Sequence, residues 1–202
     1  MLDWLKNIGK DYPDYWKNYL SKFEKKPSRF VALSLETTGL NPKKDIILSV
    51  GAIGIEHNKI VVKDVLEIEF PKPIKEEVSE NVIDQMFKDV RVPKVTESVA
   101  LEKLIDYIGN SVIVGHRTLF DIEIINETLE KYNCGRLKNE SLDIEVMYKK
   151  LLDINDKNFS LDDLKKIYKI NTSDRTSTVE DAYSIGLLFL KLKSKLDIHI
   201  QA

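Results

Sequence analysis

The chain has 202 residues, with 31 lysines and arginines against 33 aspartates and glutamates, and a formal net charge of −2. A chain of this length can bury enough apolar surface for one domain, and its 43% hydrophobic and 32% charged residues exclude disordered, collagen-like and low-complexity classes. The near-neutral charge also excludes the strongly basic footprint of a high-affinity duplex-DNA binder, so any contact with nucleic acid has to be local.

Cysteine usage and the first residues point to a compartment. Cys134 is the single cysteine, which excludes an internal disulfide framework and a thiolate-rich zinc site; we expect it to be a small buried hydrophobic side chain. Charged residues interrupt the N-terminal stretch, so it lacks the apolar core of a signal peptide. No stretch approaches the roughly 20 apolar residues of a membrane span. We therefore expect a soluble cytoplasmic protein without a membrane partner.

Residues 1–28 form an aromatic and basic extension that contains both tryptophans, Trp4 and Trp16. Pro13 is well placed to open a helix, and an apolar stripe at helical spacing follows it: Tyr15, Trp16, Tyr19, Leu20 and Phe23. Two interpretations stay open. The helix either packs on the back of the main domain or docks on a nucleic acid or a replication or repair partner.

The remaining sequence predicts one α/β domain over 29–196 and a short tail over 197–202. Three strands are expected at 29–35, 46–56 and 60–70, the last two joined as a hairpin by a polar connection at 57–59. One more strand is expected at 111–115. Helices are expected near 80–88, 97–108, 119–132, 144–152 and 176–195, and a further helix after a capping box at 160–163. Meandering strands followed by β/α alternation predict a mixed sheet with helices on both faces.

The end of the first strand carries a candidate acid. Side chains alternate along a strand, so Ser34 and Glu36 should face one side and Leu35 the other. Gly39 permits a sharp turn directly after the strand. Taken alone, Glu36 fits a solvated residue at a strand end at least as well as a functional one.

Two further acids lie near predicted strand and helix ends. An apolar strand ends in Gly115-His116 and leads into a helix with Asp121 in its first turn, where helix capping also favours aspartate. Asp181 lies one position before the apolar stripe of the last helix, so it either borders the sheet or is solvated.

Together, the strand-end Glu36, the motif from His116 to Asp121 and the late-helix Asp181 resemble the DEDD-type (DnaQ-like) 3′-to-5′ exonuclease superfamily. The likeness is greatest to the proofreading epsilon subunit of bacterial DNA polymerase III and its stand-alone relatives, and it runs from about Arg29 to Leu196. It implies a ribonuclease H-like, mixed five-stranded sheet flanked by helices, and catalytic acids Glu36, Asp121 and Asp181. In such enzymes two Mg²⁺ or Mn²⁺ ions activate a water and stabilise the departing oxygen.

The chain departs from this pattern where the family places its chemistry. Ser34 stands where the family has a bridging aspartate, so it could hold a metal only weakly or through a water. Thr176 stands where one subclass has its general-base histidine, and Ser177 where another has a tyrosine. Arg117 and the segment 87–90 also differ from the family pattern, which puts the grip on the terminal nucleotide in doubt.

The resemblance implies that the 3′-terminal nucleotide of a single strand, which we expect to be DNA, is contacted by Thr37, Thr38, Leu40 and His116. Three hypotheses follow from the sequence. The chain is a metal-dependent 3′-to-5′ exonuclease, weakened by its missing ligand and base; it is an impaired homologue that binds nucleic-acid ends or docks on a partner; or it is a structural module with no role in nucleic-acid chemistry. Retention of three acids in register argues against the third.

Overall fold

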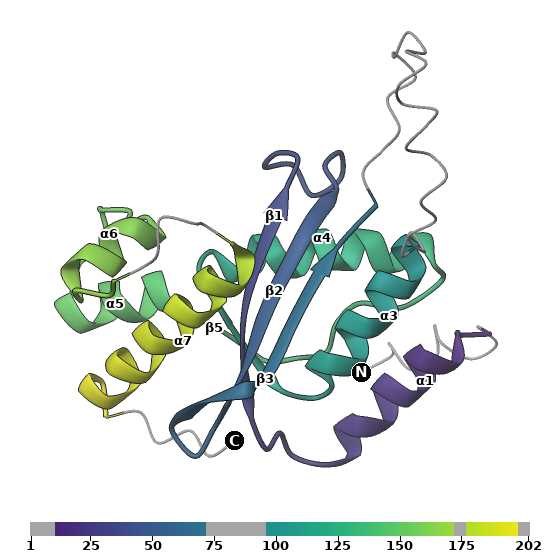
Figure 1. Ribbon diagram of the computed structural model, residues 1–202, viewed down its shortest axis with the longest axis horizontal. Coiled ribbons are helices and arrows are strands. Elements are labelled where there is room, and N and C mark those ends of the chain that lie inside the picture. The colour runs from purple at the N-terminus through teal and green to yellow at the C-terminus, as the bar shows by residue number, and fades with distance from the viewer. Residues whose placement is uncertain (1–10, 72–95, 172–176, 198–202) are drawn as a thin grey trace, which may run out of the picture.

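The computed structural model describes residues 11–71, 96–171 and 177–197. In this part of the chain, five strands form one mixed sheet in the order β3-β2-β1-β4-β5 (Figure 1). β1 pairs antiparallel with β2 and β2 antiparallel with β3, whereas β1-β4 and β4-β5 are parallel. The strands are β1 (Phe30–Thr37), β2 (Ile47–Glu56), β3 (Lys59–Glu69), β4 (Val112–Gly115) and β5 (Ser141–Asp143). The predicted mixed sheet flanked by helices is therefore confirmed.

Helices cover both faces of this sheet. α1, α3 and α4 lie on one side, and α5, α6 and α7 lie on the other (Figure 1). Their bounds are α1 (Asp14–Ser21), the 3₁₀ turn η2 (Lys22–Glu24), α3 (Glu97–Ile108), α4 (Thr118–Lys131), α5 (Ile144–Leu152), α6 (Leu161–Ile167) and α7 (Thr178–Lys195). The helix predicted near 80–88 lies outside the described residues.

Alternation along β1 divides the core into two layers. Val31 and Leu33 belong to the core under α3 and α4, while Phe30 and Ala32 belong to the core under α7. Continuing this period of two places Ser34 and Glu36 on the α7 face, as the sequence predicts. The side of the sheet on which the candidate acid lies thus follows from which residues of β1 are apolar.

Two predicted boundaries need correction. The sequence indicates residues 141–143 only as the lead-in to a helix, but they form β5, the fifth strand. Three residues are too few for an alternation pattern to be visible. The last helix begins at Thr178 rather than at 176, because the Ser177 side chain accepts a hydrogen bond from the Glu180 N–H and so caps the helix.

Local signals for turns and caps are otherwise accurate. The β2-β3 hairpin turns at His57 and Asn58, whose φ angles of 49° and 58° are those of a two-residue hairpin turn. The predicted capping box before α6 is present, since Ser160 and Asp163 each accept a hydrogen bond from the other's backbone N–H.

α1 belongs to the core of the domain. Trp16 and Tyr19 are each only 1% exposed and stack with ring centroids 4.6 Å apart. The Tyr19 hydroxyl donates to Asn139 Oδ1 at 2.7 Å and accepts from the Lys138 N–H at 2.8 Å. This supports the packing interpretation of the extension, and these aromatic side chains are not available to a partner. Trp4 lies outside the described residues.

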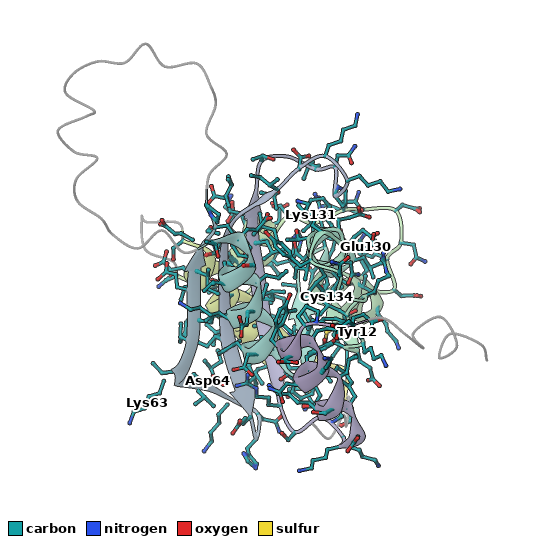
Figure 2. The ribbon with its side chains drawn as sticks, turned by 90° about the vertical axis from the view of Figure 1, so that its right-hand side faces the viewer. Tyr12, Lys63, Asp64, Glu130, Lys131 and Cys134 are labelled. Carbon is teal, nitrogen blue, oxygen red and sulfur yellow. The ribbon has the colours of Figure 1, made fainter. Side chains whose placement is uncertain are left out.

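The end of α4 meets the residues before α1. Figure 2 shows Tyr12 beside Cys134 and Glu130, and all three line one surface pocket. Cys134 is buried, and its Sγ lies 3.1 Å from the Tyr15 hydroxyl oxygen. The interpretation of Cys134 as a buried structural side chain is therefore confirmed. None of the helices in the described ranges is long and apolar enough to cross a membrane.

Replacing Trp16 tests whether α1 is part of the fold. Trp16→Ala should lower the free energy of unfolding by about 3–5 kcal/mol, because it removes a fully buried ring and leaves a cavity. Lys17→Ala is the matched control on the same helix, since Lys17 is half exposed. Urea denaturation measures both. A loss below about 1 kcal/mol for Trp16→Ala would mean that α1 is a separate docking segment.

Candidate active site

A cleft of about 430 Å³ opens where the C-terminal end of β1 meets the first turn of α7. Its residues come from four elements, β1, β2, β3 and α7, and the segment that caps α7. They are Ser34, Leu35, Glu36, Leu48, Ser49, Glu67, Glu69, Ser177, Thr178 and Asp181. The cleft therefore brings together three of the residues singled out from the sequence, Ser34, Glu36 and Asp181.

α7 can reach this position because β2 has a glycine beneath it. A Cβ on Gly51 would lie 2.1 Å from the carbonyl carbon of Thr178, closer than real Cβ atoms come to any backbone atom. Gly51 is paired with Ser34 on β1 and with Glu67 on β3. The absence of a side chain at Gly51 thus lets the first turn of α7 lie directly over the sheet, next to Ser34.

The neighbouring cross-strand row carries more acid. Glu36 pairs with Ser49, which pairs with Glu69, and the Ser49 hydroxyl donates to Glu36 Oε2 at 3.1 Å. Glu36 is exposed. With Glu67 and Asp181, four carboxylates line one cleft, so a polyanion entering it would be repelled unless cations accompany it.

Asp181 is held by a lysine from another helix. Lys165 Nζ lies 3.2 Å from Asp181 Oδ1, and the lysine side chain is only 7% exposed. Lys165 itself does not line the cleft. The third acid of the pattern is therefore already paired with a positive charge.

Asp121 is more deeply buried than the other two acids. It is in the first turn of α4, 8% exposed, and does not line the cleft. Burial, and after it the negative charge of Asp143, raise the pKa of Asp121 well above its ordinary value. Among the described residues, no hydrogen bond or ion pair engages its carboxylate. Folding therefore makes the Asp121 carboxyl group easier to protonate than an exposed aspartate.

Asp143 has a structural role next to Asp121. It caps α5, with Oδ1 accepting from the Glu145 N–H at 2.8 Å, while Oδ2 accepts from the Thr118 N–H at 2.9 Å. These bonds tie the ends of β4 and β5 together and fix the start of α4. Asp143 thereby places Asp121 at the same edge of the sheet as the cleft.

His116 is part of a buried polar network behind the site. Its Nε2 is 2.8 Å from the Phe159 carbonyl oxygen and 3.8 Å from Glu145 Oε2. Burial raises the pKa of Glu145, but hydrogen bonds from Lys149 and the Phe159 N–H outweigh it and hold that pKa below its usual range. His116 therefore connects β4 to the segment before α6.

The loop after β1 is folded on itself. The Thr37 hydroxyl donates to the Gly39 carbonyl at 2.8 Å, and the Thr38 hydroxyl donates to Asp45 Oδ1 at 2.8 Å. The Thr38 N–H already donates to the Ile46 carbonyl. Leu40 is 81% exposed. The loop thus presents Leu40, rather than the two hydroxyls, to an incoming ligand.

Thr176, where the resemblance expects a general base, lies outside the described residues, as does the segment 87–90. Ser177 lines the cleft and caps α7.

Sequence reasoning missed four residues of this region: Asp143, Lys165, Glu67 and Glu69. For Lys165 a signal exists, because it falls at position i+4 of the apolar stripe Leu161, Leu164, Tyr168, where a charged side chain is unexpected. Glu67 and Glu69 alternate with apolar residues of β3, but nothing in their spacing shows that they face the cleft.

Comparison with known proteins identifies the family. Residues 31–189 match the model of the Exonuclease (RNase_T) family. The chain belongs to this exonuclease family. It is similar to DNA polymerase III PolC-type of Caldanaerobacter subterraneus subsp. tengcongensis, at 29% identity over 170 residues, and of Clostridium perfringens, at 28% over 182. These matches cover 83% and 84% of the chain but only 12% of each relative.

Solved structures show the same fold. Escherichia coli exonuclease I bound to a dT13 oligonucleotide superposes with a TM-score of 0.64 at 17% identity, over 84% of this chain and 42% of that one. Exonuclease X bound to 5′ overhanging duplex DNA gives 0.54 at 18% identity, over 84% and 93%. The predicted ribonuclease H-like, DnaQ-like exonuclease fold with an N-terminal helix is thus confirmed.

This family generally uses divalent metal ions, so the donor set can be tested against a two-ion centre. The described residues contain no group of three or more His, Cys, Asp or Glu side chains placed to hold a metal ion. Ser34 offers a neutral hydroxyl, Asp181 is paired with Lys165, and Asp121 lies outside the cleft. The residues present do not fit the two-ion centre that the resemblance implies.

The environment of Asp121 predicts an unusual effect on stability. Asp121→Asn should raise the free energy of unfolding at pH 7, because it removes a carboxyl group whose ionised form is made costly by burial and by the charge of Asp143. The wild type should gain stability as the pH falls through the raised pKa of Asp121 and on toward its ordinary value of 3.8, and the variant should lack this gain. Thermal and urea unfolding in EDTA from pH 4 to 8 measure both effects.

Asp143→Asn is the matched control, made at the neighbouring acid. It weakens the cap of α5 and should be neutral or destabilising. Destabilisation of Asp121→Asn at pH 7 would contradict this account of Asp121.

Proposed function

We propose that this chain is a 3′-to-5′ exonuclease domain that binds the 3′ ends of single strands, of DNA in preference to RNA, and slowly hydrolyses the terminal nucleotides. The observation that carries the proposal is the cleft itself, in which Glu36 of β1 and Asp181 of α7 face one space in a chain of the exonuclease family. The fold brings these acids together from positions far apart in the sequence, and a purely structural module has no need of this arrangement.

Several features support a nucleic-acid end as the ligand. The polymerase relatives act on DNA by name, and two structural neighbours were solved with DNA bound. In this chain the exposed Leu40 could pack on a terminal base, and Lys43 and Lys44 follow it on the same exposed loop. Because such contacts do not read base edges, we expect little sequence preference.

The weakness of the chemistry follows from the residues in the cleft. Glu36 and Asp181 can orient a water and accept its proton, but no described residue provides the bridging carboxylate that the family has at position 34. Loss of groups that support a metal costs about 10- to 100-fold, and loss of a general base about a further 100- to 10,000-fold. Accelerations of phosphate-ester hydrolysis are large enough for some turnover to survive both losses.

A second candidate is a homologue that binds 3′ ends without cleaving them. The serine at position 34 and the ion pair on Asp181 favour it. Docking on a replication or repair partner through the N-terminal extension has less support, since Trp16 and Tyr19 are buried in the domain. The assay below separates this candidate from the first.

The test is degradation of 5′-labelled single-stranded DNA and RNA in Mg²⁺ or Mn²⁺. Wild type should shorten DNA slowly from the 3′ end, Asp181→Asn should abolish the ladder, and Ser34→Asp should accelerate it by about 10- to 100-fold by restoring an acid to the cleft. Asp156→Asn is the matched control, because Asp156 is an exposed acid that does not line the cleft.

Each pattern of cleavage has a distinct meaning. Cleavage only by Ser34→Asp would favour the binder that does not hydrolyse. Absence of cleavage by all variants, together with absence of binding to a 3′ end, would contradict both candidates.

A further inference from the structure

We propose that Lys165 is a built-in counter-charge for Asp181 that weakens the binding of divalent cations in the cleft. The proposal rests on the function proposed above only in treating Asp181 as an acid that faces cations and substrate. Lys165 Nζ lies 3.2 Å from Asp181 Oδ1, within hydrogen-bonding distance of an ammonium group and a carboxylate.

The position of Lys165 makes this pairing compulsory. The lysine is on the apolar side of α6, next to the buried Leu164, and its side chain is 7% exposed. A buried ammonium group is costly unless an opposite charge or hydrogen bonds compensate it. The buried Lys165 ammonium group therefore requires a nearby carboxylate, and this carboxylate is that of Asp181.

The second acid near Lys165 is a weaker partner. Asp162 Oδ1 is 3.4 Å away, and the Asp162 side chain is 75% exposed, whereas that of Asp181 is 32% exposed. Solvent screens an exposed pair much more strongly than a half-buried one. Most of the compensation for the lysine charge therefore comes from Asp181.

Lys165 contacts Asp181 without lining the cleft itself. Asp181 lines the cleft and Lys165 does not, so the lysine is a positioning residue and touches no ligand there. A divalent cation that enters the cleft and binds Asp181 would share the carboxylate with an ammonium group only a few ångströms away. Repulsion between the two like charges should lower the affinity for the cation.

The experiment measures Mn²⁺ binding directly, by titration calorimetry and by the electron paramagnetic resonance signal of free Mn²⁺, without nucleic acid. Lys165→Met keeps the length and apolar stem of the side chain and removes its charge. It should bind Mn²⁺ about 10- to 100-fold more tightly than wild type, the range expected for a residue that acts on a metal ligand. Lys166→Met is the matched control, since Lys166 is the exposed neighbour on the same helix, and its affinity should be close to that of wild type.

A double variant traces the effect to Asp181. Lys165→Met combined with Asp181→Asn should lose the gain in affinity, and because it removes both charges of the pair it should fold even if Lys165→Met alone is unstable. Thermal melting of each variant in EDTA checks this. If Lys165→Met folds, the proposal is overturned when this variant and wild type bind Mn²⁺ with equal affinity, or when the double variant binds Mn²⁺ as tightly as Lys165→Met. If Lys165→Met does not fold, the proposal is overturned when the double variant binds Mn²⁺ more tightly than wild type.

The result is independent of the function proposed above. Mn²⁺ affinity can rise in Lys165→Met whether or not any variant cleaves or binds DNA, in which case the counter-charge is real and the exonuclease proposal fails alone. Conversely, if wild type cleaves DNA but Lys165→Met binds Mn²⁺ with the affinity of wild type, the exonuclease proposal stands and the proposed role of Lys165 is wrong.

Discussion

The close approach of α7 to the sheet at Gly51 is the contact on which the candidate site depends. With no side chain at this position, the backbone of Thr178 lies directly on β2, and the first turn of α7 carries Asp181 to the side of Ser34 and Glu36. Any larger residue at position 51 would have to push the helix away from the sheet, because the atoms that it would meet belong to the backbone. The absence of a side chain at Gly51 thus determines both how α7 packs on the sheet and where Asp181 lies relative to Ser34 and Glu36.

Charge is distributed unevenly around this contact. Four carboxylates line the cleft, and one of them is paired with a buried lysine. Burial and the charge of Asp143 raise the pKa of Asp121, which does not line the cleft. A cluster of acids without compensation repels both its own members and a phosphodiester. Ser34, which is neutral, and Lys165, which is positively charged, both reduce that repulsion. Less negative charge in the cleft then has to be neutralised by metal cations. In the function proposed above, the same changes that reduce this repulsion weaken the hydrolysis of phosphodiesters.

Much of the fold follows from sequence because long periodic segments report which faces are buried. The period of two in β1 correctly predicts that Ser34 and Glu36 share a face, whereas the apolar stripe of the last helix left open whether Asp181 borders the sheet or is solvated. The strand β5 escapes such reasoning because its three residues are too few to show an alternation pattern. Contacts between elements escape it too: no spacing shows that Lys165 reaches Asp181 or that Asp121 does not line the cleft, since both depend on how helices pack on the sheet.

The central claim is that the cleft between β1 and α7 receives a free 3′ end. The most direct measurement compares the binding of wild type to a linear single-stranded DNA with its binding to the same sequence closed into a circle, in Ca²⁺ so that hydrolysis is suppressed. The account predicts that the linear strand binds at least about tenfold more tightly, a difference of about 1.4 kcal/mol, and that a second linear strand competes while the circle does not. Equal affinity for the linear and the circular strand would contradict the account, because a cleft that receives a free end has to bind a strand with an end more tightly than a continuous strand.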